Sequence, residues 1–182
     1  MAAFAQRVVV LITGVQAAGK STVAQLLAER LPRSVHVRGD LFRRMVVNGR
    51  ADLGPEPSAA ALAQLRLRYR LAAQTTDAYF DAGFTVIVQD VILGEFWAEM
   101  VGLIRSRPLL AIVLAPSPAA VAAREHARAK SAYGAWSVDG LDALLRQQTP
   151  RLGLWLDTSD QTPDQTVAEI LRRAWAEAAV PG

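Results

Sequence analysis

The stretch RVVVLITGVQAAGKS, residues 7–21, decides the fold of this chain of 182 residues. Its first half, Arg7 to Thr13, is apolar and rich in β-branched residues, which is typical of a strand buried on both faces of a parallel sheet. Gly14 ends that strand. The following residues, 21–31, carry apolar side chains at helical spacing and stop at Pro32. The pattern predicts a strand, a glycine-bounded loop and a helix, the first unit of an α/β fold.

The loop in this unit, GVQAAGKS at residues 14–21, has the pattern G-x-x-x-x-G-K-[ST]. A preceding strand and a following helix identify it as a phosphate-binding loop rather than a chance glycine-rich turn. Its glycines let the backbone wrap closely, so that N–H groups and the helix N-terminus face phosphate oxygens. Lys20 is expected to reach the β- and γ-phosphates of ATP, and Ser21 to bind Mg²⁺. The residues expected to bind the nucleotide are Gly14, Val15, Gln16, Ala17, Ala18, Gly19, Lys20, Ser21 and Thr22.

Composition excludes several classes of protein. Hydrophobic residues make up 52% of the chain and charged residues 20%, which excludes intrinsic disorder. Cysteine is absent, so disulfides, a thiolate nucleophile, an iron–sulfur cluster and a cysteine-bound zinc are excluded. The two histidines, His36 and His126, are too few and too far apart in sequence for a histidine-rich metal site.

The charge pattern and the apolar stretches predict a cytoplasmic protein that binds neither nucleic acid nor a membrane. Its 20 basic and 17 acidic residues give a net charge of +3 without a run of five like charges. The longest uncharged stretch, 108–123, has internal prolines and is shorter than the ~20 apolar residues of a membrane-spanning helix. Residues 7–15 resemble a short signal peptide, but cleavage there would destroy the phosphate-binding loop. No feature of the sequence specifies an oligomeric state.

Apolar strands and helices alternate along the rest of the chain. Strands are predicted at 34–38, 84–89, 109–115 and 152–156, and helices at 41–47, 59–82, 95–105, 118–128, 138–148 and 163–179. Glycines and prolines within 48–58 predict a loop. Five strands separated by helices predict a parallel sheet covered on both faces, in a single domain of residues 1–182.

Two aspartates follow predicted strands, where open α/β sheets bind their ligands. Asp90, after the strand 84–89, is expected to position Mg²⁺ directly or through water; the alternative is a helix cap or turn residue. Asp40, after the strand 34–38, is expected to accept the proton of an attacking hydroxyl. The alternative for Asp40 is an N-cap of the helix predicted at 41–47.

Two arginines share one face of the helix predicted at 118–128. Arg124 and Arg128 are spaced i, i+4, and Lys130 lies just beyond them. They precede a small, polar segment, at the point where a compact kinase has a lid that brings cations to the transferring phosphoryl group. We expect a lid at about residues 124–137 in which Arg124 and Arg128 are catalytic. An ordinary charged stripe that faces solvent is the alternative.

Residues 14–21, 37–42 (VRGDLF) and 86–94 (VIVQDVILG), with the Arg124, Arg128 and Lys130 cluster, resemble the chloramphenicol phosphotransferase-like group of P-loop kinases. That group is similar to the adenylate kinase, gluconate kinase and zeta-toxin kinases. The resemblance implies a three-layer P-loop NTPase fold with a five-stranded parallel sheet in the order 2-3-1-4-5. It also implies ATP and Mg²⁺ at the carboxyl edge, an acceptor-activating Asp40, and lid arginines at Arg124 and Arg128.

The sequence departs from that group on the acceptor side. Gln89 stands beside Asp90 where a second acidic residue is expected, and Arg43 with Arg44 makes the acceptor side more cationic. The expected function is ATP-dependent phosphorylation of a hydroxyl on a small molecule, with antibiotics among the candidate acceptors. The alternatives are a nucleotide, sugar or nucleotide-sugar kinase, and an ATP-binding switch that makes no phosphorylated product. A GTPase is disfavoured because the N-K-x-D motif is absent.

Overall fold

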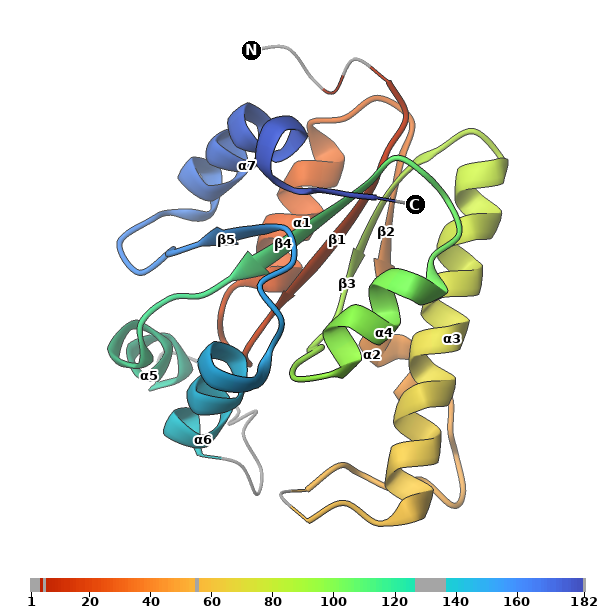
Figure 1. Cartoon of the computed structure of the whole chain (residues 1–182), viewed down its shortest axis with the longest axis vertical. Coiled ribbons are helices and arrows are strands. Elements are labelled where there is room, and N and C mark those ends of the chain that lie inside the picture. The colour runs from red at the N-terminus through yellow and green to blue at the C-terminus, as the bar shows by residue number, and fades with distance from the viewer. Residues whose placement is uncertain (1–3, 5, 55, 127–136, 182) are drawn as a thin grey trace.

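The computed structural model describes residues 4, 6–54, 56–126 and 137–181 (Figure 1). Its central sheet has the strand order β2-β3-β1-β4-β5, and these strands are parallel. The strands are β1 (Val9–Gly14), β2 (Ser34–Arg38), β3 (Thr85–Gln89), β4 (Leu109–Leu114) and β5 (Leu154–Leu156). Helices cover both faces of this sheet (Figure 1). The predicted α/β fold and strand order are therefore confirmed.

The helices lie close to their predicted positions. They are α1 (Lys20–Glu29), α2 (Gly39–Arg44), α3 (Ala59–Asp81), α4 (Phe96–Leu103), α5 (Pro118–His126), α6 (Val138–Ala143) and α7 (Pro163–Glu177), with a π-helical turn at Leu144–Gln148. Helix α1 packs against α7, and α3 packs against α2 and α4. None of the helices in the described part of the chain is long and apolar enough to cross a membrane.

The strand register brings three chain segments to one edge of the sheet. Arg38 of β2 and Ile12 of β1 both pair with Gln89 of β3. The residues that follow these positions, which include Asp40, Asp90 and the loop after Gly14, therefore emerge side by side at the carboxyl ends of the strands. Strands β1 and β4 are buried along their whole length, so this edge rests on a rigid core.

Two details of the fold differ from the sequence predictions. A sixth strand, β6 (Ala179–Val180), pairs antiparallel with β4 where the sequence predicts the end of a helix. Two residues are too few to show strand periodicity, and β6 follows α7 directly where it pairs with Leu109 and Leu110 of β4. Helix α2 begins at Gly39 rather than Leu41, so Asp40 lies inside its first turn. Arg128, Lys130 and most of the predicted lid lie outside the described residues.

Candidate active site

The loop between β1 and α1 has the shape that a phosphate requires. Gly14 has a φ of 150°, and a Cβ there would lie 2.4 Å from the carbonyl oxygen of Leu114 in β4. Only glycine therefore allows the loop to leave β1 so close to β4. Gly19 is the N-cap of α1, with a φ of 94° and no atom within 4 Å of where a Cβ would stand. The N-terminus of α1 thus opens onto space without a side-chain cap, which fits an anionic phosphate group.

Lys20 places its ammonium group over the same loop. It is the first residue of α1 and is only 8% exposed. Its Nζ donates a hydrogen bond of 2.7 Å to the carbonyl oxygen of Val15. The cation is therefore held inside the curve of the loop, next to the helix N-terminus, where the charge of a nucleotide phosphate would be neutralised.

Asp40 is an ionised carboxylate between two arginines of its own helix. Nε of Arg43 lies 3.2 Å from Oδ1, and Nε of Arg44 lies 2.6 Å from Oδ2. Burial alone would raise the pKa of Asp40, but the hydrogen bonds from Arg43 and Arg44 hold it below its ordinary value. The N-cap of α2 is Arg38, so the alternative interpretation of Asp40 as a helix cap is wrong. The carboxylate is charged at neutral pH and placed at the sheet edge.

Asp90 lies one residue beyond β3 and is only 3% exposed. Both of its carboxylate oxygens are paired with the guanidinium of Arg68, and Nε of Arg68 lies 2.5 Å from Oδ2. The backbone N–H of Val91 donates a further hydrogen bond of 2.7 Å to Oδ1. A Cβ at Gly39 would lie 2.0 Å from Oδ2, so the carboxylate also rests against the backbone that leads into Asp40. A cation can reach Asp90 directly only by displacing Arg68.

Arg68 is a site residue that our sequence analysis missed. It lies on α3, three residues after Leu65 and four before Ala72, on the stripe that carries the apolar core residues of this helix. A single charged residue on an apolar stripe is the one pattern that would have indicated a buried ion pair. Its partner Asp90 is 22 residues away in sequence, so nothing local identifies it.

Arg124 connects the phosphate-binding loop to the loop after β5. Its Nη2 donates hydrogen bonds to the carbonyl oxygens of Thr158, at 2.5 Å, and Ser159, at 3.3 Å. Its Nη1 lies 3.5 Å from the carbonyl oxygen of Ala18. Arg124 therefore lies at the same edge of the sheet as the phosphate-binding loop, and its interpretation as a member of a solvent-facing stripe is wrong. The role of Arg128 stays a prediction, because that residue lies outside the described part.

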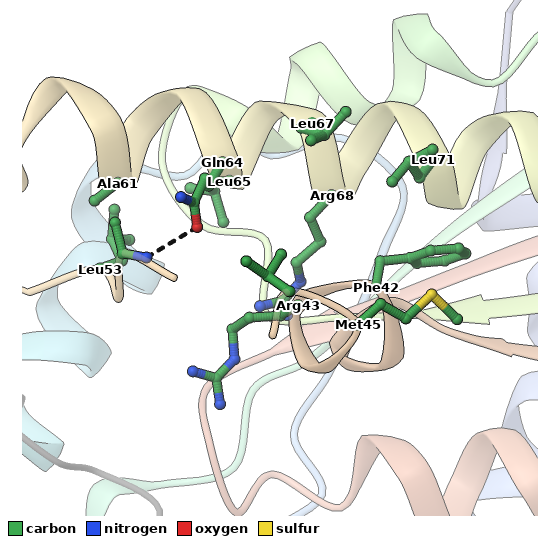
Figure 2. A pocket seen from close by; sticks show the side chains of 12 residues that line it. Phe42, Arg43, Met45, Leu53, Ala61, Gln64, Leu65, Leu67, Arg68 and Leu71 are labelled. Carbon is green, nitrogen blue, oxygen red and sulfur yellow. Dashed lines mark hydrogen bonds between the residues drawn. The ribbon is translucent and has the colours of Figure 1, made fainter. Parts of the chain in front are cut away.

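An apolar cavity of about 200 Å³ lies between α2 and α3 (Figure 2). Phe42 and Met45 line it on the side of α2, and Leu67 and Leu71 line it from α3. The guanidinium-bearing side chains of Arg43 and Arg68 also line it. Two further aromatic residues of this region, Tyr69 and Trp97, are buried in the core.

Mg²⁺ fits this site only in the way typical of phosphate-bound magnesium. Among the described residues, no group of three or more His, Cys, Asp or Glu side chains could hold a metal ion. Mg²⁺ is usually bound by one or two protein ligands together with nucleotide phosphates and water. Ser21 is an exposed residue in the first turn of α1, and its hydroxyl group is of a kind that fits this role.

Residues 9–149 match the AAA domain family AAA_33. The chain belongs to this family. No curated protein matches the sequence. Among solved structures, the tunicamycin resistance protein of Deinococcus radiodurans is similar, with a TM-score of 0.68, 20% identity, and coverage of 97% of this chain and 100% of that one.

Two kinases have a similar structure. A sugar kinase from Janibacter sp. HTCC2649 matches with a TM-score of 0.67 and 20% identity, over 92% of this chain and 93% of that one. The APS kinase of Mycobacterium tuberculosis, in complex with AMPPNP and APS, matches with a TM-score of 0.65 and 20% identity, over 92% and 96%. These likenesses show that this AAA_33 member has the fold of P-loop kinases.

Proposed function

We propose that this AAA_33 protein is an ATP-dependent phosphotransferase that phosphorylates a hydroxyl group of a small molecule. One observation carries the proposal: the ionised carboxylate of Asp40 and the glycine-framed loop with Lys20 emerge at the same edge of the sheet. A switch that only hydrolyses ATP needs the loop but has no need of a second, acceptor-side carboxylate.

In this proposal, MgATP supplies the phosphoryl group and the protein supplies position and charge. The loop residues 14–22 hold the phosphates through their backbone N–H groups, and Ser21 holds Mg²⁺. Lys20 and Arg124, together with Arg128, neutralise the negative charge of the transferring group. The acceptor oxygen forms the new bond to the γ-phosphorus as the bond from that phosphorus to the β-phosphate oxygen breaks, and the hydroxyl proton passes to Asp40.

Asp90 has a positioning role in this account. Its oxygens are occupied by Arg68 and Val91, so it fixes the guanidinium of Arg68 beside Asp40 and influences Mg²⁺ through an intervening water. We further propose that residues 1–182 form one domain with a lid at about 124–137. Closure of that lid would bring Arg128 to the nucleotide.

The likeness to the tunicamycin resistance protein and the resemblance to chloramphenicol phosphotransferase favour an antibiotic as the acceptor. The similar sugar kinase, which superposes almost equally well, favours a sugar as the second candidate. The acceptor would be identified by incubating the protein with MgATP and, separately, chloramphenicol, tunicamycin and D-gluconate, with detection of the phosphorylated product by mass spectrometry.

The control for this experiment is the Lys20→Ala variant. Loss of a cation beside the transferring phosphoryl group typically removes about 10²-fold or more of the rate. The variant should keep its fold, because the hydrogen bond that Lys20 donates to the Val15 carbonyl oxygen lies within the loop itself. Acceptor-dependent product that disappears in Lys20→Ala supports the proposal. Slow ATP hydrolysis that no acceptor accelerates would support the switch instead.

A further inference from the structure

We infer that the cavity between α2 and α3 binds an apolar group of the acceptor, so that the substrate is an alcohol carrying a compact apolar moiety rather than a sugar. This inference rests on the proposed phosphotransferase function. It concerns the part of the acceptor that does not react.

The walls of the cavity are apolar. They include Phe42, Met45, Leu53, Leu65, Leu67 and Leu71, whereas its polar side chains are those of Arg43, Gln64 and Arg68. Met45 is 68% exposed and Leu67 is 42% exposed, so apolar surface continues to the mouth of the cavity. A sugar would leave its hydroxyl groups without hydrogen-bond partners against such walls, which costs binding free energy.

The cavity is built by fixed contacts rather than left by loose packing. Gln64 of α3 accepts a hydrogen bond from the N–H of Ala51, at 2.9 Å, and donates one to the carbonyl oxygen of Gly49, at 2.7 Å. Asp52 forms an ion pair with Arg43 of α2. The segment 49–53 is therefore fastened to both helices, and it closes one side of the cavity.

The two arginines that line the cavity also contact the two aspartates of the proposed site. Arg43 lines the cavity and also donates to Asp40, with 3.2 Å between its Nε and Oδ1. Arg68 lines it as well (Figure 2), and it also binds Asp90. The side chain of Arg43 therefore lies between an acceptor hydroxyl at Asp40 and the apolar walls of the cavity. The cavity, at about 200 Å³, is smaller than the ~300–1,000 Å³ of a pocket for a whole ligand, so it would take one group of the acceptor.

The test uses 2-phenylethanol as an apolar probe, with glycerol and D-gluconate as polar probes. Saturation-transfer NMR measures binding of each probe, and mass spectrometry measures its phosphorylation by MgATP. We expect saturation transfer to the ring protons of 2-phenylethanol, which would show that this probe binds. We also expect its kcat/KM to be at least about tenfold above those of the polar alcohols, which is the size of effect that apolar groups give in such pockets.

Two pairs of variants assign the binding to the cavity. Ala51→Phe fills it, because Ala51 lines it, whereas Ala60→Phe adds the same ring at an exposed position of α3. Leu67→Gln makes the cavity wall polar, and Leu41→Gln is its control, since Leu41 is 48% exposed and does not line the cavity. The first variant of each pair should lose the NMR signal of 2-phenylethanol, and the second should keep it.

The outcomes separate the two claims. Equal 2-phenylethanol binding in Ala51→Phe and Ala60→Phe, or in Leu67→Gln and Leu41→Gln, would overturn the inference, as would a preference for D-gluconate that all the variants share. If 2-phenylethanol binds in the cavity but no acceptor yields a phosphorylated product, the proposed function fails. The Leu67→Gln pair decides the question if the Phe variant does not fold.

Discussion

The guanidinium of Arg68 holds both oxygens of the Asp90 carboxylate in a site that is almost closed to water. The exposed fractions of the two side chains are 13% and 3%. A bidentate ion pair of this kind has a defined geometry. It joins α3 to the end of β3, where the Asp90 carboxylate lies against the backbone of Gly39, the residue before Asp40. The pair is the structural support of the proposed acceptor site, and it explains why α3 carries an arginine on its apolar stripe.

Removing either partner of this pair should destabilise the protein strongly. Arg68→Gln leaves the Asp90 carboxylate buried and unpaired, which typically costs about 3–5 kcal/mol of the free energy of unfolding. The double variant Arg68→Gln/Asp90→Asn should lose less free energy of unfolding than the two single variants together, because it leaves no unpaired buried charge. Urea unfolding measures these values.

Arg66→Gln is the matched control for that cycle. Arg66 of α3 is 44% exposed and pairs with Glu95, the N-cap of α4, and with Glu99 of α4. Its loss should change the free energy of unfolding by less than about 1 kcal/mol. Additive effects of the Arg68 and Asp90 changes would show that the two side chains do not act as a pair.

Arg124→Ala should weaken catalysis with ATP. The change leaves the carbonyl oxygens of Thr158 and Ser159 without their charged donor and frees the loop after β5 from the phosphate-binding loop. Hydrogen bonds to charged groups contribute about 1.5–3 kcal/mol, so kcat/KM for ATP should fall roughly 10- to 100-fold. Steady-state kinetics at saturating acceptor measures this, with Arg172→Ala, an exposed arginine of α7, as the control. Equal kinetics in both variants would contradict a role of Arg124 in catalysis.

Stability should decrease as the pH falls through the range in which His36 titrates. Burial and the nearby charge of Arg38 lower the pKa of His36 to about 4. Its pKa in the unfolded chain is about 6.5. Between these values the unfolded chain takes up a proton that the folded protein does not, so the free energy of unfolding falls from pH 6.5 toward pH 4 and is unaffected by this group above that range.

The His36→Gln variant isolates this contribution. The urea-unfolding free energy of the variant should depend less steeply on pH than that of the wild type between pH 6.5 and 4. The carboxylates, Asp40 included, titrate in both proteins and cancel in the comparison. Parallel curves for the two proteins would mean that His36 has an ordinary pKa.

The parts of the fold that the sequence predicted are those fixed by local patterns. The strand at 34–38 was predicted at its observed bounds, because the residues on either side break it. The phosphate-binding loop was recognised because its spacing and flanking elements lie within one short segment. Helix α3 was found from its apolar stripe and from Gly83, which follows it with a φ of 92°.

The contacts that the sequence did not predict join segments that are distant along the chain. The Arg68–Asp90 pair depends on how α3 packs against β3, and the cavity depends on Gln64 reaching back to residues 49 and 51. Asp40 was placed at the correct edge but outside helix α2, because the start of a six-residue helix at Gly39 leaves no apolar period to detect. Local patterns therefore predicted where the site lies, and tertiary packing determined how its charges are paired.

The central claim is that the Asp40 carboxylate takes the proton of the acceptor hydroxyl, and the rate of phosphoryl transfer by Asp40→Asn tests it most directly. Asn has the same size but cannot accept this proton, so transfer should fall by about 10² or more. Asp164→Asn is the control, because Asp164 is an exposed aspartate of α7 that pairs with Arg30, outside the proposed acceptor site. We predict that Asp40→Asn keeps near wild-type thermal stability and MgATP affinity but transfers the phosphoryl group at least about 100-fold more slowly, and that Asp164→Asn transfers it at the wild-type rate. Full transfer by Asp40→Asn would contradict the account.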